Sequence, residues 1–180
     1  MKTRNVPLTV SRRELLPDGS DANFRRLVHG LLAFAARLES IRGELARTVG
    51  LTAIQYTVLI SVAHLEGQGE VSVSMVADHL KLSGAFVTIE TGKLARMRLL
   101  TKLPDPQDRR RVSLRTTSKG RELLESLAPA QVPANDLLFA FLNRSGFEVL
   151  LGMLDGMIAG GDRALALLEY LKEQRRNASC

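Results

Sequence analysis

A chain of 180 residues is long enough for one domain, or for one domain with helical extensions, and this one carries a formal net charge of +6. Hydrophobic residues make up 45% of the sequence but aromatic residues only 4%, so we expect a core of mainly Leu, Val, Ile and Ala, as in helical proteins. No apolar run approaches the ~18 residues of a membrane span. The first residues lack the apolar core of a secretory signal, so we expect a cytoplasmic protein.

Residues that carry catalytic or metal chemistry are sparse. Cys180 is the single cysteine, so no internal disulfide can form. The three histidines, His29, His64 and His79, lack the spacing of metal ligands, and the sequence contains neither a Gly-rich phosphate loop nor a nucleophile elbow. We therefore expect no metal site, no cofactor and no catalytic residue, and we do not expect an enzyme.

Residues 1–21 are rich in Lys and Arg and contain two prolines, Pro7 and Pro17. They predict an N-terminal arm with one helical turn near Ser11–Leu16. Two interpretations of the arm are open. It is either an additional contact with DNA or within a dimer, or a disordered terminus.

An amphipathic pattern extends over residues 22–49. Its apolar side chains recur every three or four positions, which places them on one face of a long helix. So long a helix in so small a protein predicts packing against a second copy of the chain. Gly50 suits the left-handed residue that follows a helix, and Thr52 and Gln55 form a capping box that starts a helix to about Leu65.

Two short helix patterns begin after residue 70, with little between them. Ser72 stands where its side chain would cap the first helix, and Ser83 where it would cap the second. Residues 81–82 are left for the turn, which suits a helix-turn-helix. The second helix would bury Val87, Thr91 and Leu94.

Two strand patterns follow, over residues 99–103 and 111–115. The segment between them holds two Pro and two Asp, which favours a turn, so the whole stretch describes a winged helix. Between residues 93 and 121 ten Lys or Arg accompany only two Asp, which gives this segment a net charge of +8. A basic patch confined to one element is typical of nucleic-acid binding, whereas an ordinary solvated charged face is the alternative.

After residue 120 the pattern is helical again, but Pro129 and Pro133 interrupt it. Each proline removes a backbone donor and clashes with the preceding turn, so we expect a kink or a loop at 129–133.

The last part of the chain contains two further helix patterns. Ser145 and Glu148 form a possible capping box for the first of them. We expect Gly160 and Gly161 to end that helix, and Asp162 to cap a last helix over residues 163–176.

Three motifs carry a resemblance to a known family. They are Leu82-Ser83-x-x-x-Val87-Thr88, Asp105-Pro106-x-Asp108-Arg109-Arg110 and Thr117-x-x-Gly120. In these motifs the chain resembles the MarR family of bacterial transcriptional regulators, whose recognition helix, wing and following helix they match. The resemblance covers roughly residues 22–158. It implies a mainly α fold, with a winged helix-turn-helix, a two-stranded wing and a helical dimerisation lobe.

The resemblance also implies a division of the chain and a function. The division is an N-terminal arm at 1–21, a helical dimerisation region at 22–50 and 121–180, and a winged helix-turn-helix DNA-binding domain at 51–120. The function is that of a homodimeric, sequence-specific regulator of transcription. We expect a repressor of a pseudo-palindromic operator on double-stranded DNA, relieved by a small effector such as an aromatic acid or a thioester. The alternative is an architectural or protein-interaction module without an effector.

The recognition helix contains no Lys or Arg between Ser83 and Gly92, so small residues should make its major-groove contacts. These candidates are Ser83, Gly84, Ala85 and Thr88, although helix capping alone would explain Ser83. Lys93 and Arg96 should meet backbone phosphates. The candidates in the wing are Asp108, Arg109, Arg110 and Arg111. By resemblance, Arg110 enters a minor groove that A·T pairs make narrow, while Asp108 supports the wing.

Many members of the resembled family bind a small molecule between the dimerisation lobe and the DNA-binding lobe. The candidates here are His29 and Arg37 on the first helix and Tyr56 and His64 on the second. Arg37 could pair with a carboxylate. Each of the four also has an ordinary structural explanation, as a surface group or, for Tyr56, as a half-buried core residue.

Overall fold

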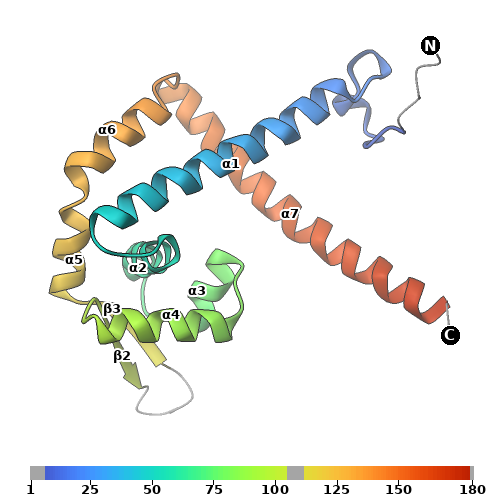
Figure 1. Cartoon of the computed structure of the whole chain (residues 1–180). Coiled ribbons are helices and arrows are strands. Elements are labelled where there is room, and N and C mark those ends of the chain that lie inside the picture. The colour runs from blue at the N-terminus through green and yellow to red at the C-terminus, as the bar shows by residue number, and fades with distance from the viewer. Residues whose placement is uncertain (1–6, 105–111, 179–180) are drawn as a thin grey trace. The chain divides into compact units, whose positions relative to one another are not determined.

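The computed structural model describes residues 7–104 and 112–178 (Figure 1). The protein is mainly helical with one small sheet, as the sequence predicts, and it divides into two compact units, residues 1–132 and 133–180. We describe each unit by itself. Besides two 3₁₀ turns at Arg13–Leu15 and Pro17–Gly19, the elements are α1 (Ala22–Thr48), α2 (Ala53–Glu66), β1 (Val71–Ser72), α3 (Val73–Leu80), α4 (Gly84–Arg96), β2 (Leu100–Pro104), β3 (Val112–Thr116), α5 (Ser118–Glu125), α6 (Ala128–Leu138) and α7 (Arg144–Ala178).

The helix boundaries of the first unit follow the caps that the sequence predicts. Thr52 and Gln55 form the reciprocal capping box at the start of α2. The hydroxyl of Ser72 accepts a hydrogen bond from the Met75 N–H at 3.2 Å, which caps α3. Ser83 does the same for α4 through the Phe86 N–H, also at 3.2 Å. Gly50 follows α1 with a φ of 71°, the left-handed conformation that glycine adopts without a steric penalty.

The sheet has three antiparallel strands in the order β1-β3-β2. The hairpin of β2 and β3 is the predicted wing, with each strand one residue later than predicted, and Lys102 stands opposite Leu114. β1 is an addition that the sequence did not predict, because two residues are too few to show alternation. It pairs Val71 with Leu114, and it thereby ties the start of α3 to the wing.

The core of this unit surrounds α2, which lies between α1 and the α3–α4 pair (Figure 1). The predicted inward residues of α4, Val87, Thr91 and Leu94, are buried, and so are Val58 and Leu59 of α2. Each fully buried aliphatic side chain contributes roughly 1.5–3 kcal/mol relative to an exposed one. This packing fixes the orientation of α4, because one face of the helix is held against α2.

The Thr117-x-x-Gly120 motif joins the wing to α5 by a close backbone approach. A Cβ on Gly120 would lie 2.3 Å from the carbonyl oxygen of Leu99, so only glycine fits at this position. The hydroxyl of Thr117 accepts a hydrogen bond from the Gly120 N–H at 2.9 Å and donates to the Arg98 carbonyl at 2.7 Å. The motif therefore holds the beginning of α5 against the segment that joins α4 to β2.

Residues 7–21 fold against the start of α1. The Asp21 carboxylate accepts hydrogen bonds from the backbone N–H of Thr9 at 2.8 Å, from its hydroxyl at 2.7 Å and from the Arg25 guanidinium at 3.0 Å. These bonds from Arg25 and Thr9 hold the pKa of Asp21 well below its usual range. The described part of the arm is thus ordered, with its predicted helical turn at Arg13–Leu15.

The chain is interrupted before the two prolines rather than at them. α5 ends at Glu125, and α6 runs from Ala128 to Leu138 with both prolines inside it, so a loop at 129–133 is wrong. Pro129 occupies the first turn of α6, where backbone N–H groups have no acceptor within the helix, so the lack of an N–H breaks no hydrogen bond there. Pro133 is accommodated inside α6.

The second unit contains one helix where the sequence predicted two. α7 continues through Gly160 and Gly161 for 35 residues, so the predicted break there and the predicted cap at Asp162 are both wrong. Two glycines cost about 2 kcal/mol of helix propensity, which the long flanking turns offset. At the N-terminus of α7 the capping side chain is that of Asn143, which accepts a hydrogen bond from the Gly146 N–H at 2.8 Å. The predicted cap at Ser145 is therefore also wrong.

Within the described ranges, no single helix is both long and apolar enough to cross a membrane. Only α1 and α2 taken together reach that length and composition, and they are bent by 92°.

Candidate nucleic-acid interface

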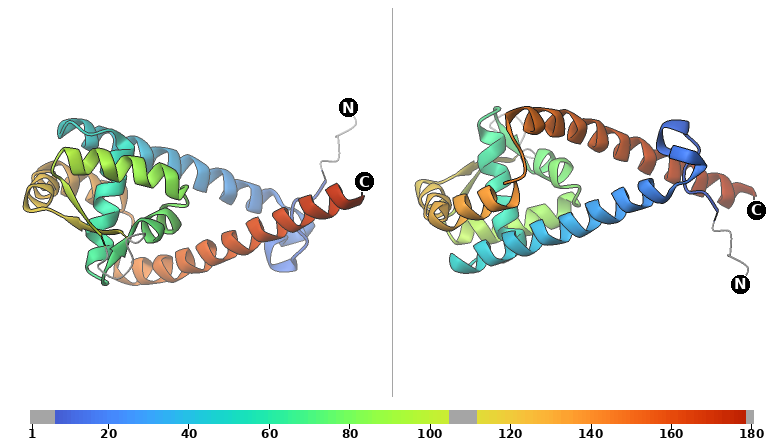
Figure 2. Two further views of the ribbon diagram at one scale, coloured as in Figure 1. Left: turned by 90° about the horizontal axis from the view of Figure 1, so that it is seen from below. Right: turned by 90° about the horizontal axis from the view of Figure 1, so that it is seen from above.

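The helix-turn-helix presents the N-terminal half of α4 on the surface of the first unit. α3 packs against α4, and α4 against β2, so the three elements lie side by side (Figures 1 and 2). The turn between α3 and α4 is made by Lys81, which adopts a left-handed conformation with a φ of 53°. The predicted contact residues Ser83, Gly84, Ala85 and Thr88 are all exposed.

The polar groups of this surface are partly engaged within α4. Ser83 accepts the capping hydrogen bond from Phe86 described above, as the ordinary structural explanation requires, and its hydroxyl proton remains available to an acceptor. The Thr88 hydroxyl donates to the Gly84 carbonyl at 2.8 Å. Only its acceptor lone pairs and its methyl group are therefore left for an outside partner.

Lys93 has a partner that the sequence did not indicate. Its Nζ lies 2.6 Å from Oε1 of Glu90, whose side chain is only 4% exposed. The second carboxylate oxygen, Oε2, has no hydrogen-bond partner among the described residues. A buried carboxylate needs a counterion, so Lys93 neutralises Glu90 inside the recognition helix. Arg96, one turn later, is exposed.

Lys102 of β2 attaches the wing to the recognition helix, a role that sequence reasoning missed. Its Nζ lies 3.2 Å from the Thr91 hydroxyl and 3.4 Å from the Thr88 carbonyl. The position of a lysine in a basic strand does not indicate which helix it reaches. Lys102 also lines a hollow with Ser72 and Ser113, between the first turns of α3 and α4 and the sheet.

The tip of the wing lies outside the described residues. Asp108, Arg109, Arg110 and Arg111 belong to this segment, so their predicted contacts stay predictions. The two strands that carry the tip are described, and Arg115 of β3 is exposed beside them.

The four candidate effector residues do not stand in one environment. His29 and Arg37 are exposed on α1, and Arg37 donates to the Ala33 carbonyl of its own helix at 2.8 Å. Tyr56 is buried, rather than half-buried, with the Arg42 guanidinium 5.5 Å from its ring centroid. Burial raises the pKa of the Tyr56 hydroxyl, and the positive charge of Arg42 partly opposes the rise.

His64, the fourth candidate, stands apart from Tyr56. Its ring centroid lies 5.9 Å from that of His79 on α3, and its Nε2 lies 3.2 Å from the Gln68 side chain. In the described ranges, no three His, Cys, Asp or Glu side chains are grouped where they could hold a metal ion.

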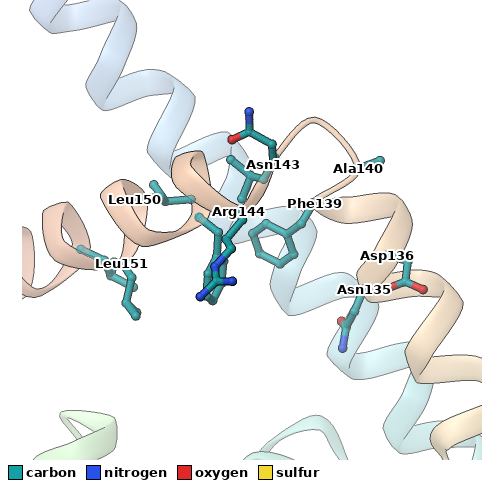
Figure 3. A pocket seen from close by; sticks show the side chains of 11 residues that line it. Asn135, Asp136, Phe139, Ala140, Asn143, Arg144, Leu150 and Leu151 are labelled. Atoms are coloured by element: carbon teal, nitrogen blue, oxygen red, sulfur yellow. The ribbon is translucent and has the colours of Figure 1, made fainter.

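The second unit contains a largely apolar groove where α6 leads into α7 (Figure 3). Its apolar walls include Phe139, Phe147, Leu150 and Leu154. Asn135, Asp136, Asn143 and Arg144 supply polar groups at its margin. The groove is open and belongs to a unit in which no described residue of α6 or α7 is buried.

The helix-turn-helix, the three-stranded sheet and the exposed α4 define a winged-helix DNA-binding protein. The MarR family model matches residues 49–111, which contain α2, the helix-turn-helix and the first strand of the wing, β2. Over these residues the chain matches the MarR family of transcriptional regulators.

Individual relatives agree with this assignment. The chain is 27% identical over 143 residues to YhbI of Bacillus subtilis, an uncharacterised helix-turn-helix transcriptional regulator, covering 79% of this chain and 87% of that protein. It resembles the structure of BpsR from Bordetella bronchiseptica with a TM-score of 0.59 and 28% identity, covering 73% of this chain and 98% of BpsR. The DNA complex of S. aureus MepR shares the fold, with a TM-score of 0.62 at 19% identity, over 74% of this chain and 96% of MepR.

Proposed function

We propose that the protein is a homodimeric repressor that binds a pseudo-palindromic operator and releases it when a small aromatic acid binds. The observation that carries the proposal is the exposed N-terminal half of α4, held by the core beside a strongly basic hairpin. A helix-turn-helix places the first residues of its second helix against base edges in the major groove. The DNA binding of the relative BpsR is regulated by 6-hydroxynicotinic acid, which supports an acid as the effector.

The proposal of a homodimer rests on apolar surface that neither unit covers. In the first unit, the exposed apolar side chains of α1 include Leu27, Leu31 and Leu32. In the second unit, they include Leu137, Phe141, Phe147, Leu151, Met153, Ile158, Leu168 and Leu171. Exposed apolar side chains in this number mark an interaction surface on each unit, and a large apolar interface is typical of an obligate homodimer. We therefore assign residues 22–50 and 121–180 to dimerisation and residues 51–120 to DNA binding.

Two-fold symmetry gives the expected mode of DNA binding. Each protomer would place α4 in the major groove of one half-site, with the two half-sites about one helical turn apart. Arg110 at the wing tip would enter the adjacent minor groove, and Asp108 would support the tip. Arg96 would meet a backbone phosphate. The local charge of the wing favours this placement, since the phosphate backbone attracts a basic hairpin.

For the effector site we retain Arg37 and His29 on α1. One guanidinium nitrogen of Arg37 donates a hydrogen bond to a carbonyl of its own helix. The remaining N–H groups can donate to a carboxylate of the effector. The buried Tyr56 is a less accessible partner than the sequence suggested. A ligand held by α1 of a dimeric protein would change the spacing of the two α4 helices, and that spacing sets the affinity for a two-part operator.

The test is an in vitro selection of DNA ligands by the full chain, followed by titration with 6-hydroxynicotinic acid as the probe. We expect one enriched two-fold sequence, and we expect the acid to weaken binding to it. Arg37→Ala should remove the response to the acid while leaving DNA affinity unchanged. A salt-dependent affinity for all DNA with no enriched sequence would instead support an architectural module, and it would reject the proposed repressor.

A further inference from the structure

The exposed surface of the first turns of α4 is apolar. Phe86 is 39% exposed and Ile89 is 56% exposed, and they are neighbours on the helix surface because they stand three residues apart. Ala85, four residues before Ile89, is exposed as well. Single exposed hydrophobic residues are ordinary, but these three form one stripe on the helix that carries the DNA-contact residues.

The same surface lacks a charged donor that could recognise guanine. No Lys or Arg occurs between Ser83 and Gly92. The first cation in the helix is Lys93, and its ammonium is held 2.6 Å from the buried carboxylate of Glu90. The commonest specific contact in the major groove is a pair of hydrogen bonds from Arg or Lys to guanine. The exposed first half of this helix has no side chain that could make that contact with a G·C pair.

Thr88, which lies beside the apolar stripe, points to the same conclusion. Its hydroxyl proton is donated to the Gly84 carbonyl at 2.8 Å. The oxygen can still accept a hydrogen bond from an exocyclic amino group, but it cannot donate to the acceptors of guanine without breaking that bond. What remains for base contact along these turns is therefore apolar surface and the acceptor oxygen of Thr88, with the Ser83 hydroxyl at the start of the helix as the one uncharged donor.

We propose that α4 reads each half-site through the C5 methyl groups of thymine, with Ile89 and Phe86 as the contacting side chains. Thymine displays a methyl group in the major groove, and an apolar side chain is the matching partner. The inference rests on the proposed function, because it requires α4 to enter the major groove of an operator. It names the chemistry of that operator: half-sites rich in thymine at the positions that face Ile89 and Phe86.

Deoxyuridine substitution tests the inference, because uracil differs from thymine only by the missing methyl group. Each thymine of the in vitro selected site is replaced singly, and binding by the full chain is measured. We expect at least one position in each half-site at which the loss of the methyl group weakens binding about fourfold, the equivalent of one buried CH₂. At these positions, Ile89→Ala or Phe86→Ala should bind thymine and uracil equally well.

Both variants should fold, because the replaced side chains are exposed and alanine is a better helix former than either. A thermal unfolding curve like that of the wild type confirms this before binding is measured. Leu103→Ala is the matched control, since it removes an exposed apolar side chain from β2 and leaves α4 intact. It should keep the full difference between thymine and uracil.

The inference is overturned if uracil replaces thymine at every position without loss of affinity. It is also overturned if both α4 variants keep the wild-type preference for the methyl group. If the selection enriches no sequence at all, the proposed function fails instead, so the two failures are distinguishable.

Discussion

Removing the ammonium group of Lys93 should destabilise the winged helix. Glu90 lies inside the fold with one oxygen bonded to Lys93 at 2.6 Å and the other without a partner among the described residues. Lys93→Ala leaves this carboxylate without its counterion. Breaking a buried ion pair from one side costs about 3–5 kcal/mol, but the Lys93 side chain is 43% exposed, so water weakens the pair. We therefore expect a loss of about 1–2 kcal/mol in the free energy of unfolding.

Urea unfolding at one fixed protein concentration measures this loss. Lys93→Ala should unfold at a lower urea concentration than the wild type. The double variant Glu90→Gln with Lys93→Ala should recover part of the loss, because no charge then remains buried. If Lys93→Ala unfolds at the wild-type midpoint, the pair does not stabilise the recognition helix, and the reasoning from burial is refuted.

Salt dependence of DNA binding separates the two roles open to Lys93. The sequence predicts a phosphate contact for both Lys93 and Arg96. In the described part of the chain, Lys93 is paired with the Glu90 carboxylate, whereas Arg96 is exposed. Arg96→Ala should reduce the salt slope by about one. The double variant at Glu90 and Lys93 should leave the slope nearly unchanged, and an equal fall in the slope would identify Lys93 as a phosphate contact after all.

The remaining predictions concern a glycine, an acid and the wing tip. Gly120→Ala should lower the free energy of unfolding by about 1–3 kcal/mol because its Cβ would meet the Leu99 carbonyl. Gly92→Ala, where the Cβ meets nothing, should raise it by about 0.5–1 kcal/mol, and a similar response of both glycines would argue against the close approach. The lowered pKa of Asp21 means that its contribution to stability is present above about pH 4 and is lost as the pH falls further, so the stability gap between the wild type and Asp21→Asn should shrink from pH 6 to pH 2. A gap that stays constant with pH would contradict the Asp21 hydrogen bonds. Arg110→Ala should weaken operator binding by about 1–3 kcal/mol and relax the A·T preference at the outer flank of each half-site, whereas an equal loss on G·C-rich flanks would make Arg110 a phosphate contact.

Local signals predicted most of the first unit. Ser72 and Ser83 cap their helices as expected, since an N-cap hydrogen bond needs only the residues of one turn. The Thr117-x-x-Gly120 motif was recognisable for a similar reason, although its close contact with Leu99 became clear only in three dimensions. β1 was not predictable because its two residues form a strand only by pairing with β3, far along the chain.

Tertiary context decided the features that the sequence misjudged. An acid in a recognition helix is expected on its surface, and only packing shows that Glu90 is buried and that Lys93 is its partner. The glycine pair at 160–161 weakens α7 without ending it, because helix propensity is a weak preference that the whole helix overrides. The candidate effector residues follow from the family resemblance and not from a pattern in the sequence. They therefore include both exposed residues, such as Arg37, and the buried Tyr56.

The most direct test of the account is a hydroxyl-radical footprint of the full chain on its in vitro selected DNA, with the stoichiometry of the complex measured by sedimentation. The account predicts two chains for each DNA site and two protected half-sites about 10 base pairs apart, centre to centre, related by two-fold symmetry. A folded monomer that protects a single asymmetric half-site would contradict it.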